Sequence, residues 1–287
     1  MTLTFREKLK SNKFLITAEL MPPKGVDILP LTKKLKYLTN VDAINITDNQ
    51  RASMRASSVA ISKIIIDHGL TPILQLVTRD KNRIALQSDL LGANILGIEN
   101  VLLLSGDHTN TSEYYNAKAI YDLDTIQFIK TARLLETGID LVGKKLYGSP
   151  KFCIGAVTNP AAIPQELQIL MFKKKVIAGV EYFQTQAIFD VNTYKTFFMK
   201  IKSLNRKVLP GLIVIKSVKF MKFIQTLPGI NIPQYIQDKI YFSQDPLAEG
   251  KRICSSMIKE LRSFADGVHI MAIGTEEHIP DIINDSF

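Results

Sequence analysis

The feature that most constrains the fold of this chain is a short apolar run, rich in β-forming residues, that recurs eight times along its 287 residues. The predicted strands are residues 14–19, 43–47, 72–77, 101–104, 152–157, 182–185, 209–215 and 268–273. Segments with helical periodicity separate most of them, at residues 57–68, 84–96, 124–137, 164–178 and 190–204. Alternating strands and helices predict a parallel sheet whose crossover connections are right-handed.

Eight strand–helix units in one chain favour a closed (β/α)8 barrel over an open doubly wound sheet. A barrel of this kind uses about 250 residues as one domain. The open-sheet alternative is weakened because no GxGxxG motif follows a predicted strand and no Walker-type loop occurs. We therefore predict a single (β/α)8 TIM-barrel domain over residues 1–287, with a short N-terminal helix covering the bottom of the fold.

Glycines and one long gap refine this prediction. Gly69, Gly97, Gly138 and Gly179 each follow a helical pattern, at a place where glycine commonly ends a helix. The longest gap separates the last two predicted strands. We expect it to hold the seventh helix together with an extra loop, INIPQYIQDKI, at residues 230–240.

The composition is that of an ordinary globular protein, with 46% hydrophobic and 22% charged residues. Cys153 and Cys254 have neither zinc-ligand nor redox spacing, so a reducing cytosol is the simplest compartment. No apolar run approaches the roughly 18 residues of a membrane span, and the charged N-terminus does not read as a signal peptide. We expect a cytoplasmic protein without a membrane span.

The formal net charge of +9 has three interpretations: a solvated lysine-rich surface, an anionic small-molecule partner, or nucleic acid. The lysines are dispersed, and the one run of three, at residues 173–175, is not interleaved with arginine or aromatic residues. Dispersed charge favours the solvated surface, with an anionic ligand second. We do not expect a nucleic-acid partner.

In a barrel of this class the carboxyl ends of the strands carry function, and the opposite face carries stability. Polar residues and glycine gather at these predicted ends: Glu19, Thr47, Asp48, Thr78, Arg79, Asp80, Gly106, Asp107, Thr158, Asn159, Gln186 and Lys216. A purely structural protein has no need of so many polar groups on one rim. The clustering predicts an active site at this end of the barrel.

Three of these residues suggest particular chemistry. Glu19 precedes two prolines, and we interpret it as a partly desolvated carboxyl group able to donate a proton, against the alternative of a salt bridge with a lysine. Asp107 follows Gly106, which permits close approach of a planar ligand, although an Asx turn or helix cap explains it equally. The Gln186 amide could bind the edge of a heteroaromatic ring, or it could be a core amide whose hydrogen bonds are made within the protein.

Other reaction chemistry has no clear motif. Lys173, Lys174 and Lys175 lie near the C-terminal end of a predicted helix. Positive charge stabilises this end of any helix through the helix dipole, so the three lysines are weak evidence for a phosphate site. The four histidines lack metal-ligand spacing, and we predict no metal site. The absence of GxSxG gives no support to covalent catalysis. His269 is expected to be a buried structural residue on the same strand face as Met271.

Seven segments, in order, cover nearly the whole chain: TAELMPPKG, INITDNQRASMRAS, TRDKNRIALQSDLLGA, GIENVLLLSGDH, KKKVIAGVEYFQTQAIFD, LPGLIVIKS and GVHIMAIG. Together they resemble the methylenetetrahydrofolate reductase family, especially the short form of acetogenic and related anaerobic bacteria. The resemblance implies a flavin-dependent oxidoreductase that interconverts 5,10-methylenetetrahydrofolate and 5-methyltetrahydrofolate. In this family, hydride passes from reduced flavin to the methylene carbon after the five-membered ring of the folate opens to an iminium.

The resemblance also implies roles for individual residues. Glu19 would be the general acid that assists ring opening, Asp107 would lie between flavin and pterin, and Gln186 would bind the pterin. The flavin contacts carry over to Thr47, Asp48, Gln75, Ser105, Gly106, Asp107, Asp122, Gly155, Asn159, Lys174 and Lys175. Lys174 and Lys175 would lie near the phosphates.

The chain departs from the family pattern at several positions, and these departures bear on the cofactor. It has Val77-Thr78 where relatives often carry Thr-Cys, Gln168 for an acidic residue, Met171 for an asparagine, and Gly274-Thr275 without the arginine that some relatives use on folate. FAD is the expected cofactor, with FMN or loss of the flavin as the alternatives.

The resemblance implies a folate substrate and electrons from NAD(P)H or from a partner subunit, which in the short anaerobic forms is often cysteine-rich and contains zinc. An oligomer is expected. The competing interpretations are a flavin-free pterin-binding barrel that transfers a methyl group to a corrinoid protein, and a dependent subunit of a larger redox complex.

Overall fold

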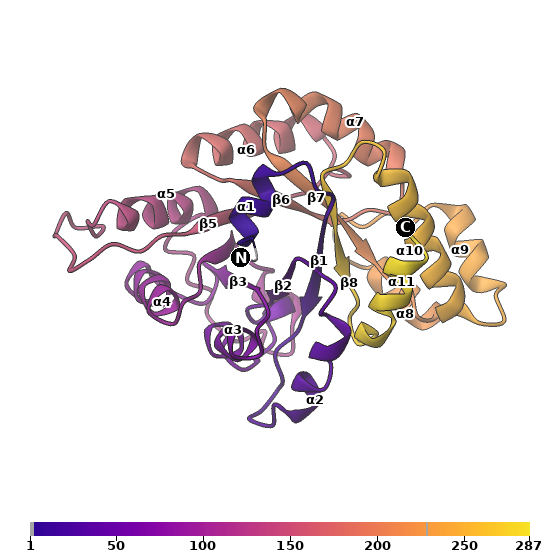
Figure 1. Ribbon diagram of the computed structural model, residues 1–287, viewed down its shortest axis with the longest axis horizontal. Coiled ribbons are helices and arrows are strands. Elements are labelled where there is room, and N and C mark those ends of the chain that lie inside the picture. The colour runs from indigo at the N-terminus through magenta and orange to yellow at the C-terminus, as the bar shows by residue number, and fades with distance from the viewer. Residues whose placement is uncertain (1–2, 228) are drawn as a thin grey trace.

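Within residues 3–227 and 229–287, the part of the chain that the computed structural model describes, eight parallel strands close into a barrel in chain order (Figure 1). They are β1 (Leu15–Leu20), β2 (Ala43–Ile46), β3 (Pro72–Val77), β4 (Asn100–Leu104), β5 (Cys153–Thr158), β6 (Tyr182–Ala187), β7 (Lys207–Ile213) and β8 (Gly267–Met271). The ring closes where β1 pairs with β8 and Thr17 lies opposite His269. The predicted (β/α)8 barrel is confirmed.

Helices surround the barrel (Figure 1). The longer ones are α3 (Ser58–Asp67), α4 (Arg83–Ile95), α5 (Thr125–Glu136), α6 (Gln165–Ala178), α7 (Val191–Ile201) and α10 (Pro246–Leu261). The shorter ones are α1 (Phe5–Lys10), α2 (Leu29–Thr32), α8 (Val218–Ile224), α9 (Gln234–Tyr241) and α11 (Ile279–Asn284), with 3-10 turns η1 (Leu35–Tyr37), η2 (Gln50–Ala52), η3 (Thr109–Thr111), η4 (Lys202–Leu204) and η5 (Glu276–His278). Their apolar faces and the outward faces of the strands form the main hydrophobic core.

The glycines predicted to end helices do so. Gly69, Gly97, Gly138 and Gly179 follow α3, α4, α5 and α6 with φ angles of 73°, 81°, 81° and 113°. Gly179 is the C-cap of α6, and its left-handed backbone conformation is one that residues with a side chain rarely adopt. The helix boundaries therefore follow from local backbone chemistry.

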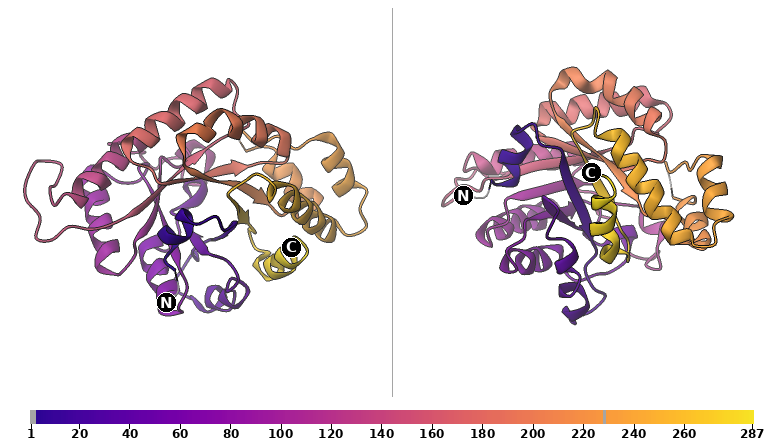
Figure 2. Two further views of the ribbon diagram at one scale, coloured as in Figure 1. Left: turned by 45° about the horizontal axis from the view of Figure 1, so that its top comes forward. Right: turned by 45° about the vertical axis from the view of Figure 1, so that its right-hand side comes forward.

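The prediction of an extra loop at residues 230–240 is wrong, because most of that segment is helix α9, which begins after Pro233. Ile236 and Ile240 are buried on one face of this helix, and Ile232, which precedes it, is buried as well. The helix packs against α8 and α10 on the outside of the barrel (Figure 2). The connection between β7 and β8 thus holds α8, α9 and α10.

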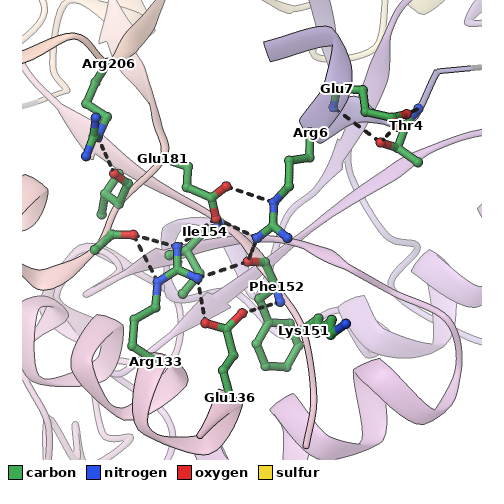
Figure 3. Close-up of polar contacts among 12 residues, drawn as sticks. Thr4, Arg6, Glu7, Arg133, Glu136, Lys151, Phe152, Ile154, Glu181 and Arg206 are labelled. Atoms are coloured by element: carbon green, nitrogen blue, oxygen red, sulfur yellow. Dashed lines mark hydrogen bonds and ion pairs between the residues drawn. The ribbon is translucent and has the colours of Figure 1, made fainter. Parts of the chain in front are cut away.

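Helix α1 covers the amino-terminal end of the barrel. Its Phe5 and Leu9 pack onto an apolar layer inside the barrel, and Phe5 contacts the Tyr182 ring edge to face at 5.3 Å. Beside it, Arg6 Nε donates to Glu181 Oε2 at 2.8 Å and Arg133 Nη2 donates to Glu181 Oε1 at 2.7 Å (Figure 3). Apolar packing and this ion pair network close the end of the barrel opposite the predicted active site.

Candidate active site

Above the apolar layer, the barrel interior contains a connected polar network. Asn45 Nδ2 donates to Gln184 Oε1 at 2.6 Å, and Gln184 Nε2 donates back to Asn45 Oδ1 at 2.9 Å. Gln184 Nε2 also donates to Thr17 Oγ1 at 3.1 Å. Thr17 Oγ1 lies 3.0 Å from His269 Nδ1. Strands β1, β2, β6 and β8 each supply one of these buried side chains, which are 0–3% exposed.

Glu19 lies two residues beyond Thr17 on β1, on the same face of the strand and nearer the carboxyl end. It is 8% exposed. Its Oε1 accepts a hydrogen bond from Gln50 Nε2 at 3.0 Å, and its Oε2 lies 3.8 Å from His269 Nε2. The carboxyl group is therefore nearly removed from solvent and faces Gln50 on the rim and His269 in the barrel interior.

Asp107 lies beyond the end of β4 and is exposed. Its Oδ2 accepts a hydrogen bond from the backbone N–H of Arg51 at 3.2 Å. Arg51 follows Gln50 in η2, so consecutive residues of one turn contact Glu19 and Asp107. Asn49 and Arg51 have positive φ angles of 43° and 58°, a conformation costly for residues with side chains and often found at functional sites. The turn brings the two predicted carboxyl groups to one rim.

Arg79, just beyond β3, connects the segments that form this rim. Its side chain is buried, and it donates to the backbone oxygens of Asp107 and Asn49, each at 3.0 Å. It also forms a two-point contact with Asp80, with both donor–acceptor distances at 2.7 Å. Burial by itself would lower the pKa of Arg79, but the hydrogen bond and charge of Asp80 raise it overall. A permanent cation therefore holds the segments after β2, β3 and β4 in one arrangement.

Gly106 is required by this arrangement. Its φ is +81°, and an added Cβ would lie 3.0 Å from Arg79 Nη1 and 3.2 Å from Val77 Cβ. A side chain here would displace the guanidinium that holds the Asp107 backbone. The packing of Arg79 and Val77 against this position therefore explains why residue 106 is glycine.

Gln186 lies on the same rim, near the end of β6, and is exposed. The pairing of β6 with β7 shifts register between Gln184 and Ala187, which is a local irregularity around Gln186. Among the described residues no side-chain hydrogen bond joins Gln186 to Glu19 or Asp107. The three predicted residues therefore share one end of the barrel, with Gln186 available to a ligand.

Two of the predicted cofactor-binding residues present polar groups that the protein does not satisfy. Thr47 is 1% exposed and its Oγ1 is buried without a hydrogen-bond partner in the described structure. The Gln75 side chain, 8% exposed, likewise makes no hydrogen bond to any described residue. By strand alternation Thr47 shares the inward face of Asn45, and Gln75 that of Ile73. Both side chains therefore face the barrel interior.

Other predicted cofactor-binding residues have partners within the chain. Asp48 Oδ2 accepts from Lys81 Nζ and from the Val77 N–H, each at 3.1 Å. Asp122 is held by Arg83 through two side-chain bonds of 2.9 and 2.8 Å. The hydrogen bonds of Arg83 lower the pKa of Asp122 to about 2. These carboxylates are already stabilised without a ligand.

The remaining predicted cofactor-binding residues are spread over β4, β5 and α6. Ser105 is exposed after β4, and Gly155 lies in β5 against the Tyr182 ring, which leaves no room for a Cβ. Asn159 accepts from the Ala161 N–H at 3.0 Å. Lys174 is exposed on α6.

Lys175, also on α6, has an unusual environment for a lysine. Its Nζ donates to the Val157 carbonyl at 2.6 Å. Burial lowers the pKa of Lys175 to about 8. The structure thus directs this cation at the backbone of β5 and leaves Lys174 as the exposed member of the pair.

Metal and thiol chemistry find no support in the part of the chain that is described. That part contains no group of three or more His, Cys, Asp or Glu side chains arranged to hold a metal ion. Cys153 and Cys254 are both buried free thiols, and burial raises the pKa of each to about 12. The described helices also include none with the length and apolar character needed to cross a membrane.

Comparison with known proteins identifies the family. Residues 4–286 match the family model described as methylenetetrahydrofolate reductase. The chain belongs to the methylenetetrahydrofolate reductase family. A relative described as "Probable methylenetetrahydrofolate reductase (NADPH)" of Caenorhabditis elegans is 23% identical over 286 residues, covering 92% of this chain and 41% of the relative. The chain therefore spans less than half of that protein.

A second relative of the family is similar in length. The 5,10-methylenetetrahydrofolate reductase of Buchnera aphidicola subsp. Baizongia pistaciae is 23% identical over 86% of this chain and 82% of its own. Among solved structures, an uncharacterized Clostridium thermocellum protein described as binding two copies of 5-methyl-5,6,7,8-tetrahydrofolic acid has a TM-score of 0.70 at 16% identity, covering 99% and 98% of the chains. A 2,3-dimethylmalate lyase reaches 0.53 at 9% identity over 99% and 85%. These likenesses show the barrel fold.

Sequence reasoning placed Glu19, Asp107 and Arg79 on the rim but missed Gln50 and the contacts that hold the two carboxyl groups. Gln50 lies in the short turn η2 and Arg79 just after β3, where periodicity carries no information about contacts. His269 was expected to be buried, and it is 3% exposed, but its approach to Glu19 was not foreseen. The pairing of β1 with β8 could have indicated it, because inward residues of paired strands lie side by side.

Proposed function

We propose that this chain is a reductase that interconverts 5,10-methylenetetrahydrofolate and 5-methyltetrahydrofolate, using hydride from a reduced flavin. One observation carries the proposal: consecutive residues of η2 contact a buried carboxyl group, Glu19, and an exposed one, Asp107. Two carboxyl groups in different environments suit two different roles. The family membership of residues 4–286 supports the choice of folate as substrate.

Glu19 is proposed as the general acid. Opening the five-membered ring of methylenetetrahydrofolate requires a proton on a weakly basic nitrogen, and a carboxyl group that is 8% exposed can supply one without competition from bulk water. The ring then opens to a cationic iminium. Asp107 is proposed to stabilise that cation, because an exposed carboxylate on the same rim is available to face it.

Gln186 is proposed to bind the pterin. Its amide has both donor and acceptor atoms, as the edge of the pterin ring does, and the side chain is exposed on the rim. The net charge of +9 supports a substrate that carries glutamate carboxylates. Folate binding by the Clostridium thermocellum protein of similar fold supports the same substrate class.

Some of the residues at the rim could bind a flavin. The partnerless Thr47 hydroxyl and the Gln75 amide face inward and would satisfy polar atoms of a heteroaromatic ring. The exposed Lys174 would contribute positive charge near phosphates. When bound, the reduced flavin supplies the hydride. FAD is proposed as the cofactor, with FMN as the alternative.

The electron donor is proposed to be NAD(P)H or a partner subunit. The nematode relative is described as using NADPH, but this chain covers 41% of that protein. A partner subunit, zinc-containing as in related anaerobic forms, is the second source, within an oligomeric and cytoplasmic enzyme. If NADH reduces the flavin bound to the isolated chain, the donor is NAD(P)H. If only an artificial donor reduces it, a partner subunit is the source.

The test of the proposed function begins with anaerobic purification. Bound oxidised flavin is expected to absorb near ~370 and ~450 nm, and the reduced protein should convert methylenetetrahydrofolate to methyltetrahydrofolate. Glu19→Gln should keep the flavin and lose about 100-fold or more in the rate of folate reduction, the range of general acid catalysis. Intact turnover in this variant would remove Glu19 as the acid.

A flavin-free barrel that binds methyltetrahydrofolate and passes on its methyl group is the second candidate. The Clostridium thermocellum neighbour, described as binding 5-methyl-5,6,7,8-tetrahydrofolic acid, favours it, as do the ion pairs of Asp48 with Lys81 and of Asp122 with Arg83. A protein that binds methyltetrahydrofolate but no flavin, and that transfers the methyl group to a corrinoid protein, would decide for this candidate.

A further inference from the structure

The buried polar network inside the barrel ends at Glu19, and its hydrogen bonds have a defined direction. The Gln184 amide nitrogen donates to Asn45 Oδ1 at 2.9 Å and to Thr17 Oγ1 at 3.1 Å, and it also lies 3.5 Å from His269 Nδ1. The Gln184 oxygen accepts from Asn45 at 2.6 Å. The two amides thus form reciprocal hydrogen bonds, and Thr17 receives a hydrogen bond from Gln184.

The Thr17 hydroxyl links this amide pair to His269. Since Thr17 Oγ1 accepts from Gln184, its proton is free to donate, and His269 Nδ1 lies 3.0 Å away. The other acceptor within reach, the Val268 carbonyl, is more distant at 3.4 Å. With Nδ1 accepting, the proton of a neutral imidazole is carried by Nε2. The ring is 3% exposed, so water does not compete for either nitrogen.

We propose that His269 is a positioning residue for Glu19, held by Asn45, Gln184 and Thr17 as the Nε2–H tautomer with its N–H directed at the carboxyl group. Nε2 lies 3.8 Å from Glu19 Oε2, while Gln50 donates to Oε1 at 3.0 Å. Each carboxyl oxygen therefore faces its own donor. This inference rests on the proposed role of Glu19 as a proton donor.

The distance of 3.8 Å between His269 Nε2 and Glu19 Oε2 indicates the role of the His269 N–H group. It is longer than a hydrogen bond to the neutral acid, whereas a charge–dipole attraction to the carboxylate acts across it and shortens it. His269 therefore stabilises the ionised form that Glu19 adopts after it gives up its proton. An interaction that is stronger after proton release than before it lowers the barrier to that release.

The first test reads the tautomer without any reaction. Protein labelled with [15N]histidine contains four histidines, and the His269 signals are those lost in His269→Gln. We expect a protonated Nε2 and an unprotonated Nδ1 for the neutral ring. This preference should weaken in Thr17→Val, where only the Gln184 amide nitrogen at 3.5 Å still faces Nδ1, and persist in Thr17→Ser. A protonated Nδ1 would mean that the amide pair points the other way and that Nε2 presents a lone pair to Glu19. That result would overturn the proposal.

The second test separates positioning from packing with two amide variants. His269→Gln places an amide near the position of Nε2, and His269→Asn places one near Nδ1. We expect His269→Asn to slow folate reduction about 10- to 100-fold, the cost of misplacing a catalytic group, with folate affinity unchanged. His269→Gln should recover most of the rate. Equal loss in both folded variants would show that the ring only fills space.

The two tests also distinguish this inference from the proposed function. Wild-type protein that fails to reduce methylenetetrahydrofolate with any donor would refute the reductase, while the tautomer measurement would still decide the geometry at His269. Active wild-type protein with a protonated Nδ1 would refute the positioning role alone. Thermal denaturation of each variant establishes that it is folded before its rate is compared.

Discussion

Replacement of Arg79 by methionine tests the arrangement of the rim directly. Methionine keeps an unbranched apolar side chain and removes the guanidinium, which is buried and bonds Asp80, Asp107 and Asn49. Loss of one partner of a buried ion pair costs about 3–5 kcal/mol. We expect the low end, about 3 kcal/mol, because the Asp80 side chain is 28% exposed and solvent compensates part of the loss. Urea denaturation measures this free energy of unfolding.

A second aspartate–arginine pair supplies the matched control. Arg83 also makes a two-point contact with Asp122, but the Arg83 side chain is 53% exposed. Exposed pairs contribute little to stability, so Arg83→Met should change the unfolding midpoint far less than Arg79→Met. Similar midpoints for the two variants would refute the argument that Arg79 organises the rim.

The pH dependence of Arg79→Met follows from Asp80. Burial by itself would raise the pKa of Asp80, but the hydrogen bond and charge of Arg79 lower it overall from 3.8. The ionised carboxylate therefore favours the folded state above pH ~3.8, and this contribution is lost as the pH falls through the lowered value. The difference in unfolding free energy between wild type and variant should narrow below about pH 4.

Three further predictions concern helix α1, helix α6 and Asp107. Phe5→Ala removes the side chain that packs on Tyr182 and should cost about 3–5 kcal/mol in urea denaturation, so a loss below about 1 kcal/mol would contradict its role in closing the barrel. Lys175, whose pKa burial lowers from 10.5 to about 8, binds fewer protons folded than unfolded between these values, so wild-type stability should rise across that range and Lys175→Met should lack the rise. Asp107→Asn should slow folate reduction and shift the flavin potential, and stopped-flow and redox titration that find neither would remove Asp107 from the mechanism.

Much of the barrel could be predicted because its signals are local. The apolar runs lie close to the observed strands, and residues 72–77 coincide with β3. Glycines marked helix ends since a left-handed residue is favoured there. The same reasoning failed at residues 230–240, where Pro233 and polar residues concealed a helix whose buried positions are isoleucines. A short helix on the outside of the barrel has a weak pattern of its own and depends on packing against α8 and α10.

The order of strands and helices, and with it the placement of Glu19 and Asp107 at carboxyl strand ends, was contained in the sequence. Alternation along one strand also placed Thr17 and Glu19 on one face. Which groups hold these residues was decided only by tertiary structure. Closure of the ring sets His269 opposite Thr17, and the fold of the β2 loop brings Gln50 to Glu19 and Arg51 to Asp107. Periodicity reports how a segment turns, whereas hydrogen-bond partners distant in sequence depend on how all segments pack together.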